Sequence, residues 1–304
     1  MTDILLANRF FRLTVSRDGQ PGRSWSHPPP VQSQAEEGLE ITFRITKTIT
    51  REPNTGQISI YNLSADSRSY CQVKGAELTL EAGYEDLHGQ IFTGQTQLVY
   101  SKREGTSWVT TLETGDGLKF LFGHGIGLAL GGRVTMRQAV EESLAAMGVP
   151  KGVHKGLDAL VDKTFPRGFV ASGNPTTTMD GLADRGGLHW SIQDGRSHVY
   201  PRGQYGSDEI ILISDVRKAG GLVGSPERFD RTLTNPFQTQ DPFANPLRGI
   251  RFKSLLNPLI VPGTRVRLES RDITGTYRCI KVTQTGDRRG QPWYSEVEAD
   301  EVRQ

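Results

Sequence analysis

The sequence predicts a mainly β fold, in which two β domains of the barrel or sandwich kind flank a small α/β insert. Short runs of alternating apolar and polar residues dominate residues 39–112 and return after residue 208, as half-buried strands require. After about residue 130 the apolar spacing changes to that of helices. The 35 glycines supply the tight turns that many short strands need.

The first domain, residues 1–122, is predicted from alternating runs that turn residues separate. Spacings of this order between strands are typical of an all-β sandwich or barrel. The runs lie at residues 39–45, 58–63, 77–84, 90–94, 97–100 and 108–112.

The insert, residues 123–207, is predicted to hold two helices and a hairpin. Thr135 stands in capping position with Gln138 three residues on, and Gly148 ends the apolar helical spacing. A second helix carries Met179, Leu182 and Ala183 and ends at residues 186–187. Residues 194–195, Asp-Gly, predict the turn of a hairpin between strands at 189–192 and 198–200.

The second β domain, residues 208–304, is predicted from alternating runs at 209–213, 263–269, 275–282 and 293–299. Residues 225–247 are polar and broken by prolines, which predicts a long loop. Long loops in compact domains often make contacts. The candidate contact residues of this loop are Phe229, Phe237 and Phe243.

The two β domains share an order of residues that indicates a repeat. A glycine precedes an alternating run, a charged hairpin follows, and a tryptophan and two acidic residues close each copy. The matched pairs are Gly75 with Gly263, Trp108 with Trp293, Glu113 with Glu298, and Asp116 with Asp300.

Composition excludes several classes of protein. The net charge is +2, with 36 basic and 34 acidic residues interspersed, which is unlike a dedicated nucleic-acid binder. No apolar stretch reaches the length of a membrane span, and the N-terminal residues lack the pattern of a signal peptide. Cys71 and Cys279 are expected to be buried thiols in strands, with a disulfide between them as the weaker alternative.

No pattern of catalytic, cofactor-binding or metal-binding residues stands out. The six histidines lack metal-ligand spacing, and the glycines at 123–127 lack the residues of a phosphate-binding loop. Asp180 and Asp184 form the best carboxylate pair for a hydrolase, but one turn of helix apart they fit a cap and a solvated face better. The sequence therefore predicts a structural protein rather than an enzyme.

Several short motifs, in this order, resemble those of baseplate hub proteins of bacteriophages with contractile tails. That group includes the T4-type central hub, the late-control-gene-D proteins and the VgrG-like proteins, and the length here is similar to a short Mu-like form. The resemblance covers about residues 39–300, and each motif alone is weak. The motifs lie at residues 41–64, 80–84, 91–94, 115–117, 221–226, 249–258 and 260–263.

The resemblance implies two β domains of tail-tube type and a ring of three copies. Such a ring would join a six-fold tail tube to a three-fold spike in the virion baseplate, after assembly in the host cytoplasm, and DNA would pass through its lumen without sequence-specific contacts. The expected partners are two further copies, the spike or needle protein, the tube protein, the tape measure protein and other baseplate proteins. The candidate ring or lumen residues are Leu78, Leu80, Tyr84, Val266 and Leu268.

Three other interpretations stay open at this point. A distal tail or tube-initiator protein of a non-contractile phage would share the same β domains. A tail-associated peptidoglycan hydrolase would need a pair of acidic residues lining a cleft in the insert. A carbohydrate-binding receptor module would need clustered exposed aromatic residues.

Overall fold

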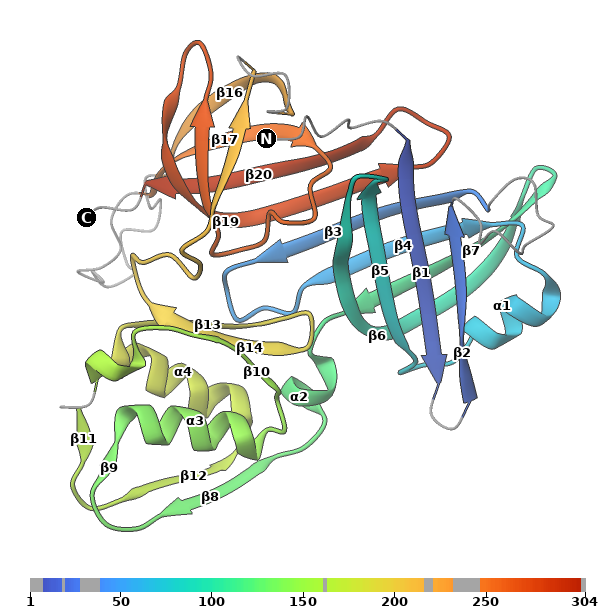
Figure 1. The fold of residues 1–304 in the computed structure, drawn as a ribbon. Coiled ribbons are helices and arrows are strands. Elements are labelled where there is room, and N and C mark those ends of the chain that lie inside the picture. The colour runs from blue at the N-terminus through green and yellow to red at the C-terminus, as the bar shows by residue number, and fades with distance from the viewer. Residues whose placement is uncertain are drawn as a thin grey trace.

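The computed structural model describes residues 8–17, 20–27, 39–160, 163–215, 221–231 and 247–301. Two β-rich units lie side by side, and an α/β unit packs below them (Figure 1). Each unit has its own cluster of buried apolar side chains. Trp293 and Leu256 belong to the second β unit in the chain but are buried in the first cluster. The predicted domain boundaries at 122/123 and 207/208 stay a prediction.

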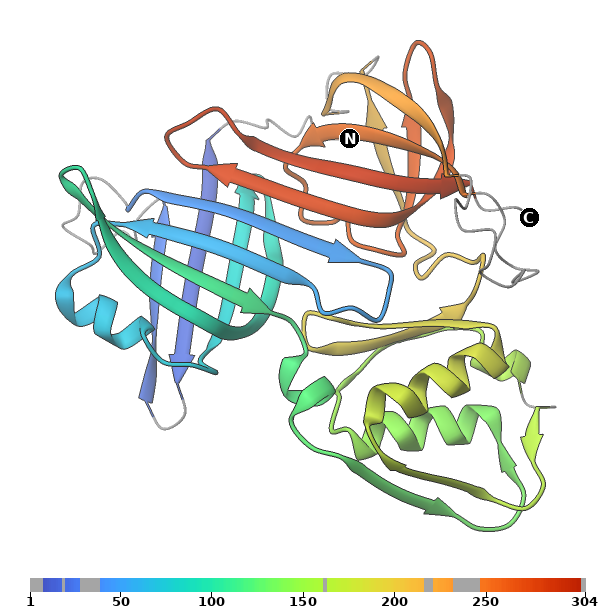
Figure 2. The same ribbon diagram turned by 180° about the vertical axis from the view of Figure 1, so that it is seen from behind.

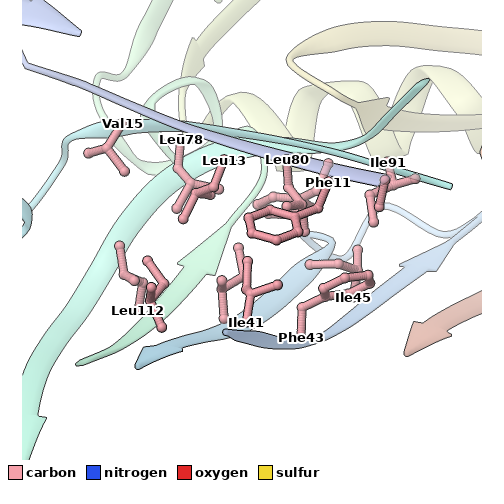
Figure 3. Close-up of a cluster of buried hydrophobic side chains, with 14 of the residues drawn as sticks. Phe11, Leu13, Val15, Ile41, Phe43, Ile45, Leu78, Leu80, Ile91 and Leu112 are labelled. Carbon is pink, nitrogen blue, oxygen red and sulfur yellow. The ribbon is translucent and has the colours of Figure 1, made fainter. Parts of the chain in front are cut away.

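The first β unit is a curled sheet whose two layers enclose the first cluster. Alternation explains its burial: in one strand Ile41, Phe43 and Ile45 point inward while the residues between them face out. Side chains from strands 9–17 and 77–84 meet them from the opposite layer (Figure 3). The elements are β1 (Arg9–Arg17), β2 (Gln20–His27), β3 (Ile41–Thr48), β4 (Thr55–Tyr61), α1 (Ala65–Cys71), β5 (Glu77–Tyr84), β6 (Leu87–Glu104) and β7 (Ser107–Gly115).

Some local predictions in this unit need correction. The runs at 90–94 and 97–100 are parts of one strand, β6, which bends at a bulge rather than turning. Cys71 is buried as expected, but it lies in α1 rather than in a strand; Ser64 caps this helix by accepting a hydrogen bond from the backbone N–H of Ser67. Cys279 is a buried free thiol in a strand, as expected.

The insert confirms its predicted elements. Thr135 accepts a hydrogen bond from the N–H of Gln138 at the start of the first long helix. Gly187 ends the second long helix at φ +68°. Asp194 and Gly195 both have positive φ, as a two-residue type I′ hairpin turn requires. The elements are α2 (Leu118–Phe122), β8 (Ile126–Leu130), β9 (Val134–Thr135), α3 (Met136–Ala146), β10 (Lys151–His154), a 3₁₀ helix (Leu157–Leu160), β11 (Thr164–Phe165), β12 (Phe169–Gly173), α4 (Pro175–Gly186), β13 (Leu188–Gln193) and β14 (Arg196–Pro201).

The second β unit corrects the predicted loop. Residues 225–231 belong to a strand, and Pro226 is tolerated there because this strand lies at a sheet edge, where a missing N–H costs little. Residues 232–246, with Phe237 and Phe243, lie outside the described part of the chain. The elements are β15 (Ile210–Ser214), β16 (Leu222–Arg231), β17 (Leu247–Leu255), β18 (Arg265–Glu269), β19 (Thr274–Asp287) and β20 (Trp293–Glu301).

The two β units share one continuous sheet. Its strand order is β16-β17-β20-β19-β3-β4-β7-β6-β5-β1-β2, with β18 and β15 joined beside β19. The connection between the units is the antiparallel pairing of β19 with β3, which runs from Lys281 opposite Thr48 to Asp287 opposite Thr42. Both views show these strands side by side across the middle of the molecule (Figures 1 and 2). We call this pairing the internal junction.

Candidate functional site

Eight consecutive strands of the sheet form one continuous surface across the two β units. We call them the open sheet, and they are β16, β17, β20, β19, β3, β4, β7 and the second half of β6, residues 97–104. One face of the open sheet covers the two β cores. The other face carries the alternate, outward residues, such as Thr42, Arg44 and Thr46 on β3.

The outward face is polar and carries both signs of charge. Over β3, β16, β17, β19 and β20 it is hollowed, with a volume of about 400 Å³. Cross-strand ion pairs line the hollow: Arg251 contacts Glu298 at 3.0 Å and Lys253 contacts Glu296 at 3.1 Å. Exposed pairs of this kind contribute about 0–1 kcal/mol each, so they set the character of the surface more than the stability. The hollow therefore has a polar wall of nearly balanced charge, with four basic and three acidic residues.

The two β units repeat the same strand arrangement. The order β3-β4-β7-β6-β5 in the first unit matches β16-β17-β20-β19-β18 in the second. Each copy has a bulge at the same place: Leu98 opposite Glu113 follows one bulge, and Lys281 opposite Glu298 follows the other. Glu113 and Glu298 therefore occupy equivalent positions, as their match in the sequence predicts.

The tryptophans of the repeat are also equivalent, but one acidic match is displaced. Trp108 lies opposite Arg103, and Trp293 lies opposite Gly286, at the same distance from the two bulges. By the same pairing Asp300 corresponds to the residue before Asp116. The sequence match of Asp116 with Asp300 is thus wrong by one position, because Asp300 is equivalent to Gly115 in the structure.

The equivalence shows which edges of the open sheet have no partner. In the internal junction, β19 of the second unit pairs with β3 of the first. The strand equivalent to β19 is β6, and from residue 97 onward β6 pairs only with β7 among the described strands. The strand equivalent to β3 is β16, which pairs only with β17 among them. Unpaired edges of this length are templates for pairing with another chain.

The five candidate ring residues lie elsewhere. Leu78, Leu80, Val266 and Leu268 are fully buried, and Tyr84 is 6% exposed. They lie on β5 and β18, and these strands stand beside the open sheet in each unit rather than within it. Their side chains pack the cores of the two units. A role for these residues in a ring or lumen stays a prediction.

Of the three predicted contact residues, Phe229 is the one within the described part of the chain, and it lies on strand β16 rather than in a loop. Its ring is 6.0 Å from the Arg251 guanidinium. A contact role for Phe229 stays a prediction. The sequence did not indicate the exposed edge residues of β6, because nothing local distinguishes a strand with two neighbours from a strand with one.

A buried polar cluster joins the open sheet to the insert. Lys47 on β3 is 2% exposed and donates to both carboxylate oxygens of Asp194, at 2.7 and 2.6 Å. Asp116, which follows β7, accepts from the backbone N–H groups of Asp194 and Gly195 at 2.6 and 2.8 Å. Asn54 donates to Asp116 at 3.2 Å. We call these residues the polar joint, and they fix the hairpin of the insert against the ends of β3, β4 and β7.

Burial governs the protonation of Asp116. Desolvation and the nearby Asp194 carboxylate raise the pKa of Asp116 to about 7, although the N–H of Gly195, Lys47 and Asn54 favour its ionised form. The folded pKa therefore lies above the value of about 3.9 for an unfolded aspartate. Protonated Asp116 is favoured in the folded state, so this group contributes stability below pH 4 that is lost as the pH rises to about 7.

Asp116→Asn is expected to remove this pH dependence. Between pH 4 and 7 the free energy of unfolding of the wild type should fall faster with pH than that of the variant, because the amide does not titrate. Urea unfolding at half-unit pH steps measures both slopes. The variant Asp66→Asn, at an exposed position on α1, serves as the control and should keep the wild-type slope. Equal slopes for Asp116→Asn and the wild type would contradict the raised pKa.

The predicted carboxylate pair and the possible metal ligands can be compared with the described residues. Among them, no group of three or more histidine, cysteine, aspartate or glutamate residues could hold a metal ion. Asp180 pairs with Arg51 and accepts from the Trp190 indole N–H, while Asp184 pairs with Arg202, so these two acids are engaged separately. No helix in the described ranges has both the length and the apolar character to cross a membrane.

The fold is that of phage tail proteins and of related secretion components. A tail protein from Neisseria meningitidis superimposes with a TM-score of 0.62 at 12% identity, over 97% of each chain. The 43 kDa tail protein of prophage MuSo2 from Shewanella oneidensis gives 0.62 at 11% identity, over 96% of each chain. A type VI secretion component of E. coli, described as similar to T4 tail proteins, gives 0.59 at 10% identity over 89% of this chain and 76% of that one.

These likenesses confirm the fold that the sequence resemblance implies. They rest on structure alone: no protein-family model and no curated protein matches the chain by sequence. The class defined by the fold is therefore the tail-protein architecture with two equivalent β units and an insert.

Proposed function

We propose that this chain is a structural subunit of a phage baseplate hub, in which three copies close into a ring. The observation that carries the proposal is the repeat with its internal junction. Within one chain, the second unit already pairs with the first through β19 and β3. The same contact between chains would pair β6 of one copy with β16 of the next. Both exposed edges of the open sheet would then have a partner.

Three copies follow from the expected match to a six-fold tube. A head-to-tail contact between equivalent edges closes into a ring if its rotation allows. With two equivalent units in each chain, a ring of three chains presents six units around its axis. The outward, polar face of the open sheet would then line the channel, because the opposite face is occupied by the cores.

The charge balance of that face suits a channel for DNA. The hollow is lined by four basic and three acidic residues, and two of the basic ones, Arg251 and Lys253, pair with Glu298 and Glu296. A strongly basic wall would hold the phosphate backbone, whereas a balanced wall lets a polyanion pass. The ring would stand in the virion, between the tail tube and the spike, and the chain has no catalytic part in the proposal.

The mass of the purified protein tests the ring. Sedimentation of the chain, alone and mixed with the spike protein of its phage, is expected to give three times the chain mass of 33.6 kDa or a complex with equal numbers of both proteins. Negative-stain images of that species should show six lobes around a hole. A two-fold dimer would contradict the head-to-tail contact, and a monomer under every condition would contradict the hub.

A further inference from the structure

We infer that neighbouring copies pair β6 with β16 in one particular register, which places Lys102 opposite Glu227 and Tyr100 opposite Phe229. This inference rests on the ring proposed above and specifies its contact surface. The partner is a second copy of this chain. The template is the internal junction, whose register is known residue by residue.

The register follows from the two bulges. Each bulge fixes the alignment of its repeat, so Leu98 corresponds to Lys281 and Lys102 to Thr285. On the other edge, Arg44 of β3 lies opposite Gln57, and Glu227 of β16 lies opposite Arg251. Gln57 in turn lies opposite Glu113, and Arg251 lies opposite Glu298, which is the residue equivalent to Glu113. Arg44 therefore corresponds to Glu227.

The pairing observed between β19 and β3 can now be applied to the equivalent strands β6 and β16. Within the chain, Thr285 lies opposite Arg44, and Thr283 lies opposite Thr46. Replacing each residue by its equivalent in the other unit sets Lys102 opposite Glu227 and Tyr100 opposite Phe229. All four side chains would then lie on the outward face of the open sheet, the face that carries the hollow.

The paired residues are complementary. Lys102 and Glu227 have opposite charges and are both exposed, and Glu227 has no ion pair within the described ranges. In the single chain Lys102 contacts Glu104 at 2.6 Å, an exposed pair that can be exchanged or shared at little cost. Tyr100 and Phe229 are both half-buried and would form an aromatic cross-strand pair. A shift by one residue would place these side chains on opposite faces.

The tryptophans of the repeat show that the free edge is incomplete. Trp293, beside the internal junction, is 1% exposed because β3 and its neighbours cover it. Trp108, at the equivalent position beside the free half of β6, is 40% exposed. Leu98 on the same edge is 51% exposed. A second copy docked through β16 would cover this apolar edge as β3 covers Trp293.

Charge exchange tests the register in the full-length protein. Lys102→Glu and Glu227→Lys should each weaken association about five-fold or more per contact, because like charges then stand opposite each other. The double variant, which restores opposite charges, should recover the wild-type association constant. Arg133→Glu makes the same charge change at an exposed residue of the insert, between β8 and β9, and should leave association unchanged. Sedimentation equilibrium measures all four.

Zero-length carbodiimide coupling provides an independent measurement. In a mixture of ¹⁴N- and ¹⁵N-labelled chains, mass spectrometry should find Lys102 joined to Glu227 in peptides of mixed label. Six strands separate β6 from β16 within one chain, so the mixed label identifies the contact between chains. If the chains form a trimer but lack this product and show no rescue in the double variant, the register is wrong and the ring stands. If the wild type never associates, the proposed register and the proposed ring are both wrong.

Discussion

Trp293→Ala is expected to lower the free energy of unfolding by about 3–5 kcal/mol, the usual effect of removing a large buried aromatic side chain. The Trp293 ring packs edge-on against Phe43 with centroids 5.3 Å apart, and its indole N–H donates to the Gly83 carbonyl at 2.9 Å. Both partners belong to the first β unit, whereas Trp293 starts β20 of the second. The substitution would therefore leave a cavity where the two units meet.

Urea unfolding of the two variants Trp293→Ala and Trp108→Ala provides the comparison. Trp108 is the equivalent residue of the other repeat, but it is exposed and contacts Arg68 at 4.5 Å. At protein concentrations where the chain is monomeric, Trp108→Ala should cost about 1 kcal/mol or less. If the two variants lose equal amounts of unfolding free energy, the burial of Trp293 at the internal junction does not add to the stability of the protein.

Lys47→Met is expected to cost about 3–5 kcal/mol, because it leaves the half-buried Asp194 and the buried Asp116 without their cation. Methionine keeps most of the volume of the side chain, so the loss reports on charge rather than on packing. Both Asp194 oxygens lose a hydrogen bond, and Asp116 is left beside an uncompensated Asp194. The loss should grow as the pH rises through about 7, where Asp116 gives up its proton.

Thermal or urea unfolding at pH 5 and pH 8 measures this effect. Lys119→Met is the matched control: Lys119 contacts Glu77 at 2.5 Å, but both side chains are at least half exposed. That substitution should change stability by less than about 1 kcal/mol at either pH. A Lys47→Met protein as stable as the control variant would show that the polar joint contributes no net stability.

Alternation and turn residues predicted most of the secondary structure. The run at 77–84 coincides with β5, and the Asp194-Gly195 turn lies where the sequence places it. Several elements were not predicted, and three of them show why. In β1, Phe10 and Phe11 are adjacent apolar residues that obscure the period of two. Helix α1 has seven residues, too few for a helical apolar pattern, and β16 contains a proline that is characteristic of loops.

The candidate site was predictable only in part, because a free edge is defined by what does not pair with it. The match of Glu113 with Glu298 was visible in the sequence and proved to mark equivalent strands. The pairing of β19 with β3 joins residues more than 230 positions apart, and no local pattern encodes such a contact. Without it the outward residues Tyr100 and Lys102 could not be distinguished from any other solvated strand face.

In the proposed ring, the internal junction would also change the thermodynamics of closure. Six separate units would have to meet at six contacts, each formed between independent molecules that lose translational and rotational freedom. Carrying two units on one polypeptide makes half of those contacts intramolecular, so they form at an effective concentration set by the chain rather than by the cell. Dilution then acts only on the contacts between chains. If the proposed ring is right, its assembly can begin from few molecules, because half of the contacts between units are already formed within each chain.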